Sequence, residues 1–492
     1  IGSEHVVGLA GTGFESGTPM AHYELHAWIV LLLGWLFLPF YIRSGAFTMP
    51  EFLEKRFDSK SRWFLSVFSL VAYVLTKVSV TIYAGGIVVS ELLGIPFWYG
   101  AIGIVLFTGA YTIIGGMKAV IYTETLQTVV LIFGSVIITF LGLQEVGGWS
   151  GLRETVTAVS PDHFNMWRPM SDPDFPWTGL LIGGTIVGIW YWCTDQYIVQ
   201  RTLAAENIKI GRRGAIFGAY LKLLPILIFL VPGIIAFALT IQNPEVFHVS
   251  KADRAFPMLV KTLLPVGLKG LVAGGLMAAL MSSLASVFNS CSTIFTIDIY
   301  KQITSQKTEK ELLTTGKIAT AIIVLLGIIW IPIMEKIGGG VMYQYLQNVQ
   351  SYIAPPVTAV FLLGIIWKRV NAKASITTLL AGLFLLVLRL GSEIYYQPQI
   401  VSNQSVDSLL YDFATINFAH MAIFMFIFSV SLCVIVSLST TPPDYKLIAG
   451  LSFGTLTPKH KNDLKGSYDK IDVVLSVLLV IIVIAILCYF TG

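Results

Sequence analysis

Ionisable side chains occur inside long apolar segments of this 492-residue chain, where each needs a partner, water or a function. A charge at the centre of a membrane helix costs roughly 2.5–3.5 kcal/mol on insertion scales. Asp298 and Arg389 lie near segment ends, so we expect them to snorkel towards water. Lys77, Glu124 and Lys222 lie deeper. The full set is Glu24, Lys77, Glu124, Asp195, Lys222, Asp298 and Arg389.

A cluster of neutral oxygens lies on one apolar segment. Ser282, Ser283 and Ser286 follow Ala279 at helical spacing. Together with carbonyls from a broken helix, such hydroxyls could bind a hard cation. Alternatively, each hydroxyl bonds the carbonyl four residues earlier in its own helix. The spacing alone leaves both interpretations open.

Two glycine-interrupted segments predict broken membrane helices. Segment 1–13 contains four glycines, and segment 183–196 combines glycines and aromatics with a polar end. Glycine costs about 1 kcal/mol in a helix interior relative to alanine. Paired broken helices at corresponding places in two halves indicate an inverted-repeat transporter, although glycines that only pack helices would give a similar pattern. The chain opens inside the first of these segments, so we expect residues to precede it.

Two other patterns do not support enzyme or metal chemistry. The glycines at 8–13 lack the order and the preceding strand of a dinucleotide site. His22-x-Glu24-x-His26 is not the HExxH motif, and nothing else suggests a zinc shell. We find no nucleophile–base pair and no block of basic residues that would bind nucleic acid. We therefore expect neither an enzyme nor a nucleic-acid partner.

The composition indicates an all-α polytopic membrane protein in a lipid bilayer. Hydrophobic residues make up 55% of the chain and charged residues only 12%, about half the usual share of a soluble domain. About 20 apolar residues span the hydrocarbon. After the partial segment 1–13, we predict helices near 20–42, 64–92, 96–115, 118–144, 178–200, 212–240, 267–299, 314–335, 341–367, 374–395, 416–438 and 471–490.

The distribution of basic residues predicts the orientation. Most of the 32 lysines and arginines fall in loops that would share one side: 43–63, around 118, 201–213, 300–317, 368–373 and 440–470. Cytoplasmic loops carry such an excess. We therefore expect these loops in the cytoplasm of a multi-pass plasma (cell or inner) membrane protein. The C-terminus would then lie on the extracellular or periplasmic side.

Several long motifs resemble the sodium/solute symporters, specifically the sodium/glucose cotransporter branch. They are WYWCTDQYIVQRTLAA (190–205), GAYLKLLP (218–225), MSSLASVFNS (281–290) and PPVTAVFLLGIIWKRVN (355–371). The resemblance implies a LeuT-type core of two inverted five-helix repeats with extra peripheral helices. The core would occupy 1–367, with its first helix cut at the start. Additional helices and a cytoplasmic loop would occupy 368–492.

The resemblance implies a sodium ion at the break in the first helix. The backbone of Ile1 and Ala279 and the hydroxyls of Ser282 and Ser283 would bind it. Hydroxyls and carbonyls suit a weakly held monovalent ion, whereas a carboxylate cage suits calcium. A second sodium site, or an exit route, would involve Glu124 and Ser286. Because Glu124 stands for the usual aspartate and a hydroxyl is missing at 285, we expect one sodium per cycle.

The resemblance also implies a sugar site. A hexose needs a mixed ring of hydrogen-bond donors and acceptors, and an unpaired polar group there costs about 1–3 kcal/mol. Gly188 departs from the polar residue that the family carries at that place. The site residues would be His5, Glu24, Gly188, Tyr191, Trp192, Lys222 and Gln347.

Aromatic and apolar side chains would gate this site, again by resemblance. Tyr191 corresponds to the inner gate, and Leu9, Tyr23 and Tyr343 correspond to the outer gate. Asp195 with Arg201 could form a structural ion pair or take part in transport.

We therefore predict a sodium-coupled symporter that imports a hexose such as glucose, galactose or mannose by alternating access. A carrier of myo-inositol, sialic acid or an amino acid is the nearest alternative. A sugar sensor or a sodium channel on the same fold is a further one.

Overall fold

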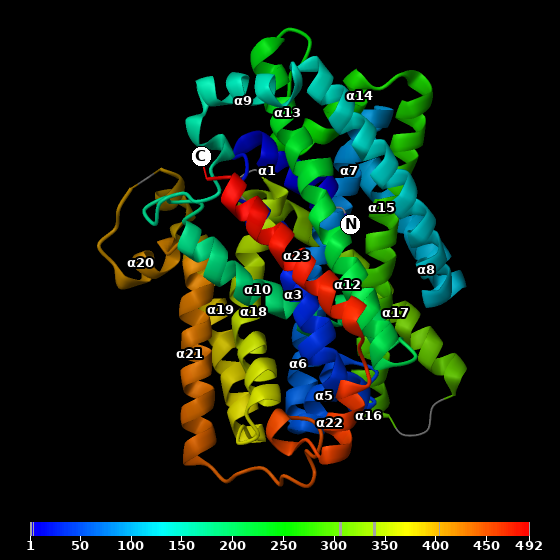
Figure 1. The fold of residues 1–492 in the computed structure, drawn as a ribbon, viewed down its shortest axis with the longest axis vertical. Helices are drawn as coiled ribbons and strands as arrows, with labels where there is room; N and C mark the ends of the chain where they lie inside the picture. The colour runs from blue at the N-terminus through cyan, green and yellow to red at the C-terminus, as the bar shows by residue number, and fades with distance from the viewer. Residues whose placement is uncertain (1, 3, 305–307, 338–340, 403, 492) are drawn as a thin grey trace.

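The computed structural model describes residues 2, 4–304, 308–337, 341–402 and 404–491, with backbone only at 111, 113–124, 126–127 and 334–337. Within these ranges the chain is helical, and its one extended pairing is a bridge between Asn165 and Thr491. Ten helical segments are long and apolar enough to span a membrane, and Phe97–Ala110 and Gly179–Thr194 are shorter apolar helices. The predicted all-α membrane architecture is confirmed (Figure 1).

The first part of the chain contains the following helical elements, where η denotes a π or 3-10 turn. They are η1 (Glu4–Leu9), α1 (Ala10–Glu15), α2 (Ala21–Glu24), α3 (Ala27–Leu32), η2 (Leu33–Phe37), α4 (Leu38–Ser44), α5 (Met49–Arg56), α6 (Ser59–Tyr73), η3 (Val74–Val78), α7 (Ser79–Leu93), α8 (Phe97–Glu145), α9 (Gly148–Val159) and η4 (Pro161–Phe164).

The remaining elements follow. They are η5 (Gly179–Gly183), α10 (Gly184–Ile189), η6 (Trp190–Thr194), α11 (Gln196–Leu203), α12 (Ile208–Pro225), η7 (Ile226–Leu230), α13 (Val231–Gln242), η8 (Ala252–Arg254), α14 (Ala255–Leu263), α15 (Val266–Thr293), η9 (Ile294–Tyr300), α16 (Lys301–Ile303), α17 (Glu309–Ile337), α18 (Met342–Ile366), α19 (Ala372–Val401), α20 (Leu409–Thr415), α21 (Phe418–Ser439), η10 (Phe453–Thr455), α22 (Pro458–Lys465) and α23 (Lys470–Tyr489).

The predicted helix break at 183–196 is present. The π turn η6 ends at Thr194, and Asp195 adopts extended backbone (φ −80°, ψ 125°) before α11 begins. The Asp195 carboxylate accepts the N–H of Tyr197 and so caps α11. In the first segment, the π turn η1 precedes α1, so this segment is also irregular. Interrupted helices expose backbone groups and helix ends in the middle of the bundle.

Helix α8 differs from the prediction, which placed a loop near Lys118 between two spans. Helical backbone runs over the whole of Phe97–Glu145. The loop was placed because one span cannot use so many residues, but lysine is a good helix former and does not by itself end a helix. Both ends of α8 lie on the same side, because Gly100 packs on Val89 and Gly142 on Leu263. The segment therefore starts and finishes on one side of the bundle, as two crossings require.

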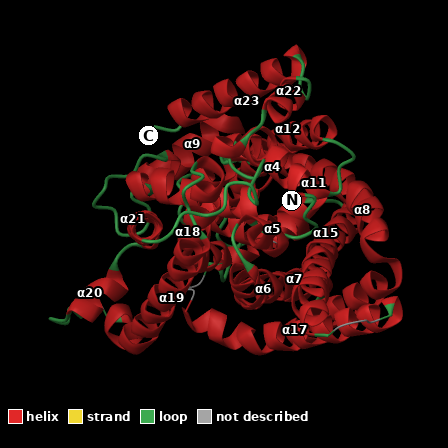
Figure 2. Ribbon diagram, turned by 90° about the horizontal axis from the view of Figure 1, so that it is seen from below, coloured by secondary structure: helices red, strands yellow, loops and turns green. Residues whose placement is uncertain are grey.

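The basic loops that were predicted to share one side contact one another. Arg62 in α6 pairs with Asp298 in η9 at 2.8 Å, and Arg56 in α5 donates to the carbonyl of Gly364 in α18 at 2.7 Å. Figure 1 shows α5, α16 and α22 at this end of the molecule. Seen from below, α19 and α21 pack against α18 on one side, and α8 lies at the opposite edge (Figure 2).

The opposite end is also tied together across the sequence. Arg254 in η8 pairs with Glu91 in α7 at 2.5 Å, and the indole of Trp149 donates to the hydroxyl of Tyr489 at 2.8 Å. The last helix, α23, crosses the outside of α3 and α12 to reach this end (Figure 1). The described chain therefore ends on the side opposite to the basic loops.

Asp298 and Arg389 do not snorkel, so that prediction was wrong. Asp298 is fully buried and accepts hydrogen bonds from Thr48 at 2.9 Å and from Arg62. Arg389 is also buried, donates to the carbonyl of Ile416 at 2.7 Å and pairs with Glu393. Partners supplied by other elements outweigh the pull of water for both side chains.

A buried aspartate joins an outer loop to the start of α18, and it predicts a pH effect. Both carboxylate oxygens of Asp253 lie 3.2 Å from the N–H of Met342, and burial raises the pKa of Asp253 to about 8. Because the folded-state pKa lies above the unfolded value of about 3.9, the protonated Asp253 carboxyl stabilises the folded protein. This contribution is complete at low pH and is lost as the pH rises through about 8.

The melting temperature in detergent should therefore fall by several degrees more in the wild type than in Asp253→Asn between pH 6 and pH 9. Asparagine keeps an acceptor for Met342 but cannot ionise. Parallel pH profiles of the two proteins would contradict this role of Asp253.

Candidate functional site

A buried carboxylate, Glu24, lies at the centre of the bundle and accepts hydrogen bonds from two other elements. The Lys222 ammonium lies 2.5 Å from one oxygen, and the Tyr343 hydroxyl donates to the other at 2.7 Å. The ring of His5 lies 3.4 Å from the first oxygen. Residues from η1, α2, α12 and α18 thus meet at one point in the membrane region, and two of them carry opposite charge.

Local interruptions of the helices place these groups. Glu24 is the last residue of α2, and α3 begins only at Ala27, so the carboxylate lies at a helix end. Lys222 precedes Pro225, which removes a backbone donor and is followed by the π turn η7. His5 lies in η1 and Tyr191 in η6. Short π-helical stretches are frequent at functional sites.

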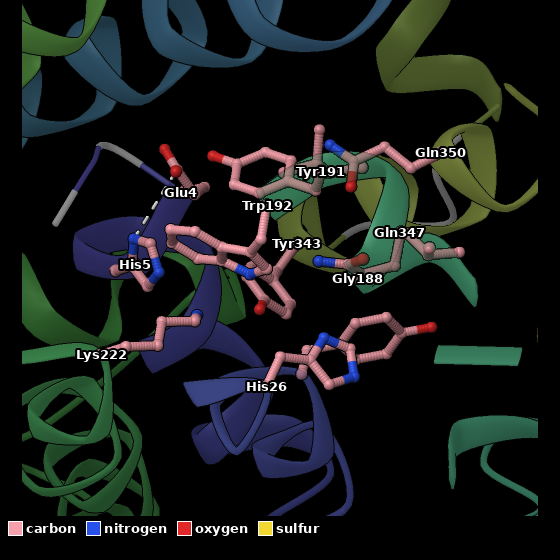
Figure 3. Close-up of a pocket in the computed structure, with 13 residues that line it drawn as sticks. Glu4, His5, His26, Gly188, Tyr191, Trp192, Lys222, Tyr343, Gln347 and Gln350 are labelled. Atoms are coloured by element: carbon pink, nitrogen blue, oxygen red, sulfur yellow. Dashed lines mark ion pairs between the residues drawn. The ribbon is translucent and has the colours of Figure 1, made fainter. Parts of the chain in front are cut away.

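These elements enclose a pocket (Figure 3). Its volume is about 40 Å³, far below the roughly 300–1,000 Å³ of a typical small-molecule pocket. A hexose would therefore need the walls to move apart. The lining residues are Glu4, His5, Tyr23, His26, Val187, Gly188, Tyr191, Trp192, Lys222, Tyr343, Leu346, Gln347 and Gln350.

The structure brings the predicted sugar-site residues together. Six of them line the pocket, and Glu24 is bonded to Lys222 directly behind the lining. Aromatic rings form part of the wall: Tyr191 and Trp192 pack edge to face at 5.0 Å, and the Lys222 ammonium lies 5.2 Å from the ring centre of Trp192. The pocket thus combines charge, amides and flat apolar surfaces.

The predicted gate residues surround the same pocket. Tyr23, Tyr191 and Tyr343 line it, whereas Leu9 is buried at the end of η1 and is not part of the lining. The Tyr343 hydroxyl donates to Glu24, which couples this tyrosine to the buried charge. A movement of α18 would break this hydrogen bond.

Next to the pocket, Asp195 forms an ion pair that differs from the predicted one. Asp195 pairs with Lys77 of η3 at 3.1 Å, not with Arg201, and the hydroxyl of Tyr73 also donates to Asp195. The Lys77 ammonium lies 4.0 Å from the ring centre of Tyr191. Arg201 instead donates to the carbonyl of Tyr197 at 2.9 Å. The partner of the Asp195 carboxylate comes from η3, far away in the sequence, and not from α11.

The predicted sodium ligands are only partly described. Ala279, Ser282 and Ser283 occupy one face of α15, and Ser283 is buried. Ile1 lies outside the described residues, so the first-helix side of the ion site is not seen. A cation could use the hydroxyls that face the bundle.

The predicted second site is likewise incomplete. The side chain of Glu124 lies outside the described residues. The hydroxyl of Ser286 is buried and accepts a hydrogen bond from the Arg201 guanidinium at 2.7 Å. The Ser286 hydroxyl is therefore already hydrogen-bonded to a cation of the protein, and the number of sodium ions per cycle stays a prediction.

Several lining residues were missed from the sequence. Glu4 and Gln350 are ordinary polar residues in apolar segments, and no spacing signal marks them. His26 belonged to the rejected metal pattern, and the structure separates that pattern: His22 bonds the carbonyl of Met166 at 3.0 Å, whereas His26 lines the pocket. Among the described residues, no cluster of side chains could hold a metal through histidine, cysteine or carboxylate ligands.

Comparison with known proteins gives this arrangement its family. Residues 1–382 match the sodium:solute symporter family. The chain belongs to the sodium:solute symporter family. It is therefore a sodium-coupled solute symporter in a membrane, and it is not an enzyme.

Relatives with different solutes resemble this symporter equally well. The sodium/glucose cotransporter 1 of Oryctolagus cuniculus is 39% identical over 480 residues, which cover 91% of this chain and 72% of that protein. A sodium/myo-inositol cotransporter of Bos taurus is 39% identical over 492 residues, which cover 92% of this chain and 68% of that protein.

Solved structures show the same fold. A Na⁺-coupled sialic acid symporter, in a substrate-bound outward-open state, superposes with a TM-score of 0.74 at 24% identity, over 90% of this chain and 88% of that one. A nucleobase–cation symporter in a closed conformation gives a TM-score of 0.50 at 11% identity, over 94% of both chains. The predicted LeuT-type fold of the symporter is confirmed.

Proposed function

We propose that this symporter imports a hexose together with one sodium ion. The observation that carries the proposal is the pocket around Glu24, where Lys222, Tyr343 and His5 converge on one buried carboxylate. Every hexose hydroxyl can both donate and accept, so an acceptor next to strong donors suits it. The Gln347 amide adds a donor and an acceptor. The rings of Tyr191 and Trp192 offer apolar surface to the C–H face of a sugar.

A solute with a carboxylate fits this pocket less well. Lys222 is already neutralised by Glu24, and Glu4 adds a second carboxylate to the lining. A sialic acid or an amino acid would place a further negative charge beside both, and like charges in a low dielectric repel strongly. This argument favours an uncharged polyol over an anionic or zwitterionic solute.

A second candidate solute is myo-inositol. It is also a cyclic uncharged polyol, and sodium/myo-inositol cotransporters are as similar to this chain as sodium/glucose cotransporters are. The two classes differ in ring oxygen and in hydroxyl stereochemistry. A choice between them depends on which lining groups meet each hydroxyl.

The transport cycle would follow alternating access. Sodium binds the oxygens of Ala279, Ser282 and Ser283 near the first helix and favours the outward-open form. The solute then enters, Tyr343 and Tyr23 close outside it, and Tyr191 opens inside it. The sodium gradient supplies the driving force, because binding shifts the population between the two forms. By the distribution of basic residues, the end of the protein with α5 and α22 faces the cytoplasm of a plasma membrane, and the C-terminus lies outside.

The deciding experiment is uptake into proteoliposomes. Radiolabelled glucose, galactose, mannose and myo-inositol are compared under an inward sodium gradient and an inward potassium gradient. Accumulation of a hexose above equilibrium, only with sodium, is the expected result. Accumulation of myo-inositol alone would select the second candidate. Sodium flux without accumulation of any solute would favour a channel, and binding without flux would favour a sensor.

Removal of one hydroxyl should weaken the sodium site. Ser283→Ala is expected to raise the sodium concentration for half-maximal uptake by roughly 5- to 50-fold, because one ligand of the ion is lost. Uptake at saturating sodium should change much less. Sodium activation curves in proteoliposomes measure both quantities.

Ser290→Ala is the matched control for this substitution. Ser290 is also buried on α15, but its hydroxyl bonds the carbonyl of Ser286 at 3.0 Å, within its own helix. Its sodium requirement should match that of the wild type. Equal sodium curves for Ser283→Ala and Ser290→Ala would remove Ser283 from the site.

A further inference from the structure

His26 is a polar side chain in the pocket wall that makes no hydrogen bond to the Glu24 carboxylate. His26 lies between α2 and α3, is only 5% exposed and lines the pocket. Among the described residues its ring nitrogens make no hydrogen bond to the protein. Its ring packs edge to face on Tyr23 at 5.4 Å, which uses ring atoms and leaves the nitrogens available. Buried polar groups in folded proteins nearly always have a hydrogen-bond partner, so the partner of His26 calls for an explanation.

The neighbouring His22 shows what a structural histidine looks like in this fold. His22 is equally buried, bonds the carbonyl of Met166 at 3.0 Å and packs against the ring of Trp167 at 5.5 Å. The two histidines are four residues apart. His26 lines the pocket (Figure 3), whereas His22 is not one of the lining residues.

The glycines of α10 make room for the ring. A Cβ atom at Gly188 would lie 2.7 Å from Nδ1 of His26 and 2.5 Å from Cδ1 of Ile29, both too close. A Cβ at Gly184, one turn earlier on the same face, would lie 3.5 Å from Nε2 of His26. His26 therefore occupies the space that a side chain at 188 would need, and it turns a polar ring towards the pocket at that place.

We propose that His26 binds the solute directly, and that His26 and Gly188 together form a specificity determinant. The proposal rests on the hexose function above. A neutral imidazole offers one donor and one acceptor, which matches a ring hydroxyl or a pair of neighbouring hydroxyls. Lys222 and Tyr343 each bond Glu24, whereas His26 bonds none of these three residues, so we expect His26 to meet a different part of the solute.

The first test removes the imidazole of His26 from the protein and, separately, single hydroxyl groups from the sugar. Uptake of D-glucose and of its singly deoxygenated analogues is measured in wild type and in His26→Ala. In the wild type, the analogue that lacks the hydroxyl bound by His26 should lose roughly tenfold or more in kcat/KM. In His26→Ala that same analogue should be transported as well as glucose, while the other analogues keep their losses.

His22→Ala is the matched control, because it removes a buried imidazole outside the pocket wall. Its analogue profile should be that of the wild type, even where its melting temperature falls. If His26→Ala lowers kcat/KM for every analogue by the same factor, or for none, His26 does not bind the solute and the proposal is overturned.

The second test concerns the steric contact between position 188 and His26, which can be measured whatever the solute is. Gly188→Ser should lower the melting temperature in detergent through its clashes with His26 and with the end of the Ile29 side chain. His26→Ala/Gly188→Ser should recover the part of this loss that His26 causes, and should shift the preference among glucose, galactose, mannose and myo-inositol. If wild type accumulates none of these probes, the hexose proposal fails, and the melting temperatures alone decide whether His26 fills this space. An equal effect of Gly188→Ser in both backgrounds would overturn the His26–Gly188 pair.

Discussion

Glu24→Gln is expected to reduce sodium-driven solute uptake to background, with a loss of about 100-fold or more in kcat/KM. Glutamine keeps the shape of the side chain but removes the charge that orients Lys222 at 2.5 Å and Tyr343 at 2.7 Å. Hydrogen bonds to charged groups contribute about 1.5–3 kcal/mol each, and the Lys222 ammonium would be left buried without its counter-charge. The measurement is initial uptake of labelled hexose into proteoliposomes, with protein folding checked by size-exclusion chromatography.

Glu393→Gln provides a closely matched control for that substitution. Glu393 also accepts from a tyrosine hydroxyl, that of Tyr352 at 2.7 Å, and also pairs with a cation, Arg389 at 2.8 Å. It lies on α19, outside the lining of the pocket. Its loss should affect stability more than uptake. Wild-type uptake by Glu24→Gln, or an equal loss in both variants, would contradict a solute role for Glu24.

The sequence predicted the helical spans and one feature of their interior correctly. Hydrocarbon thickness sets the length of each apolar run, so most spans and the break at Asp195 follow from the order of residues. The same rule placed a loop near Lys118, where the backbone of α8 stays helical. The length of an apolar segment predicts how many times the chain crosses the membrane. It does not predict the backbone conformation of the residues that connect two crossings.

The composition of the pocket was predictable for a different reason. Motifs in η6, α12 and α18 carry the resemblance to the family, and the fold brings these elements to one place. The partners of buried charges were not predictable. Asp195 pairs with Lys77, and Asp298 with Arg62, across large sequence separations that no local pattern encodes. His26 was missed because its importance comes from the space left by Gly188 on another helix.

The ion pair below Tyr191 should be the most sensitive single contact for stability. Lys77 and Asp195 are both buried, and the Lys77 ammonium also lies 4.3 Å from the ring centre of Tyr197. Removing one partner of a buried pair costs about 3–5 kcal/mol, because the other charge stays behind without compensation. Lys77→Met and Asp195→Asn should therefore each lower the melting temperature in detergent strongly, more than Glu393→Gln does.

The double variant Lys77→Met/Asp195→Asn separates stability from gating. Replacing both charges by groups of similar volume should recover most of the melting temperature, since buried ion pairs contribute little net stability. Asparagine can still cap α11, but Tyr191 loses the cation 4.0 Å from its ring centre. We therefore expect the double variant to fold. Efflux of labelled solute from sodium-loaded proteoliposomes should be faster than in the wild type, because Tyr191 retains the solute less well on the cytoplasmic side. A double variant that is as unstable as the two singles would show that the pair acts through shape and not through charge. Wild-type efflux with recovered stability would show that Tyr191 holds the solute without Lys77.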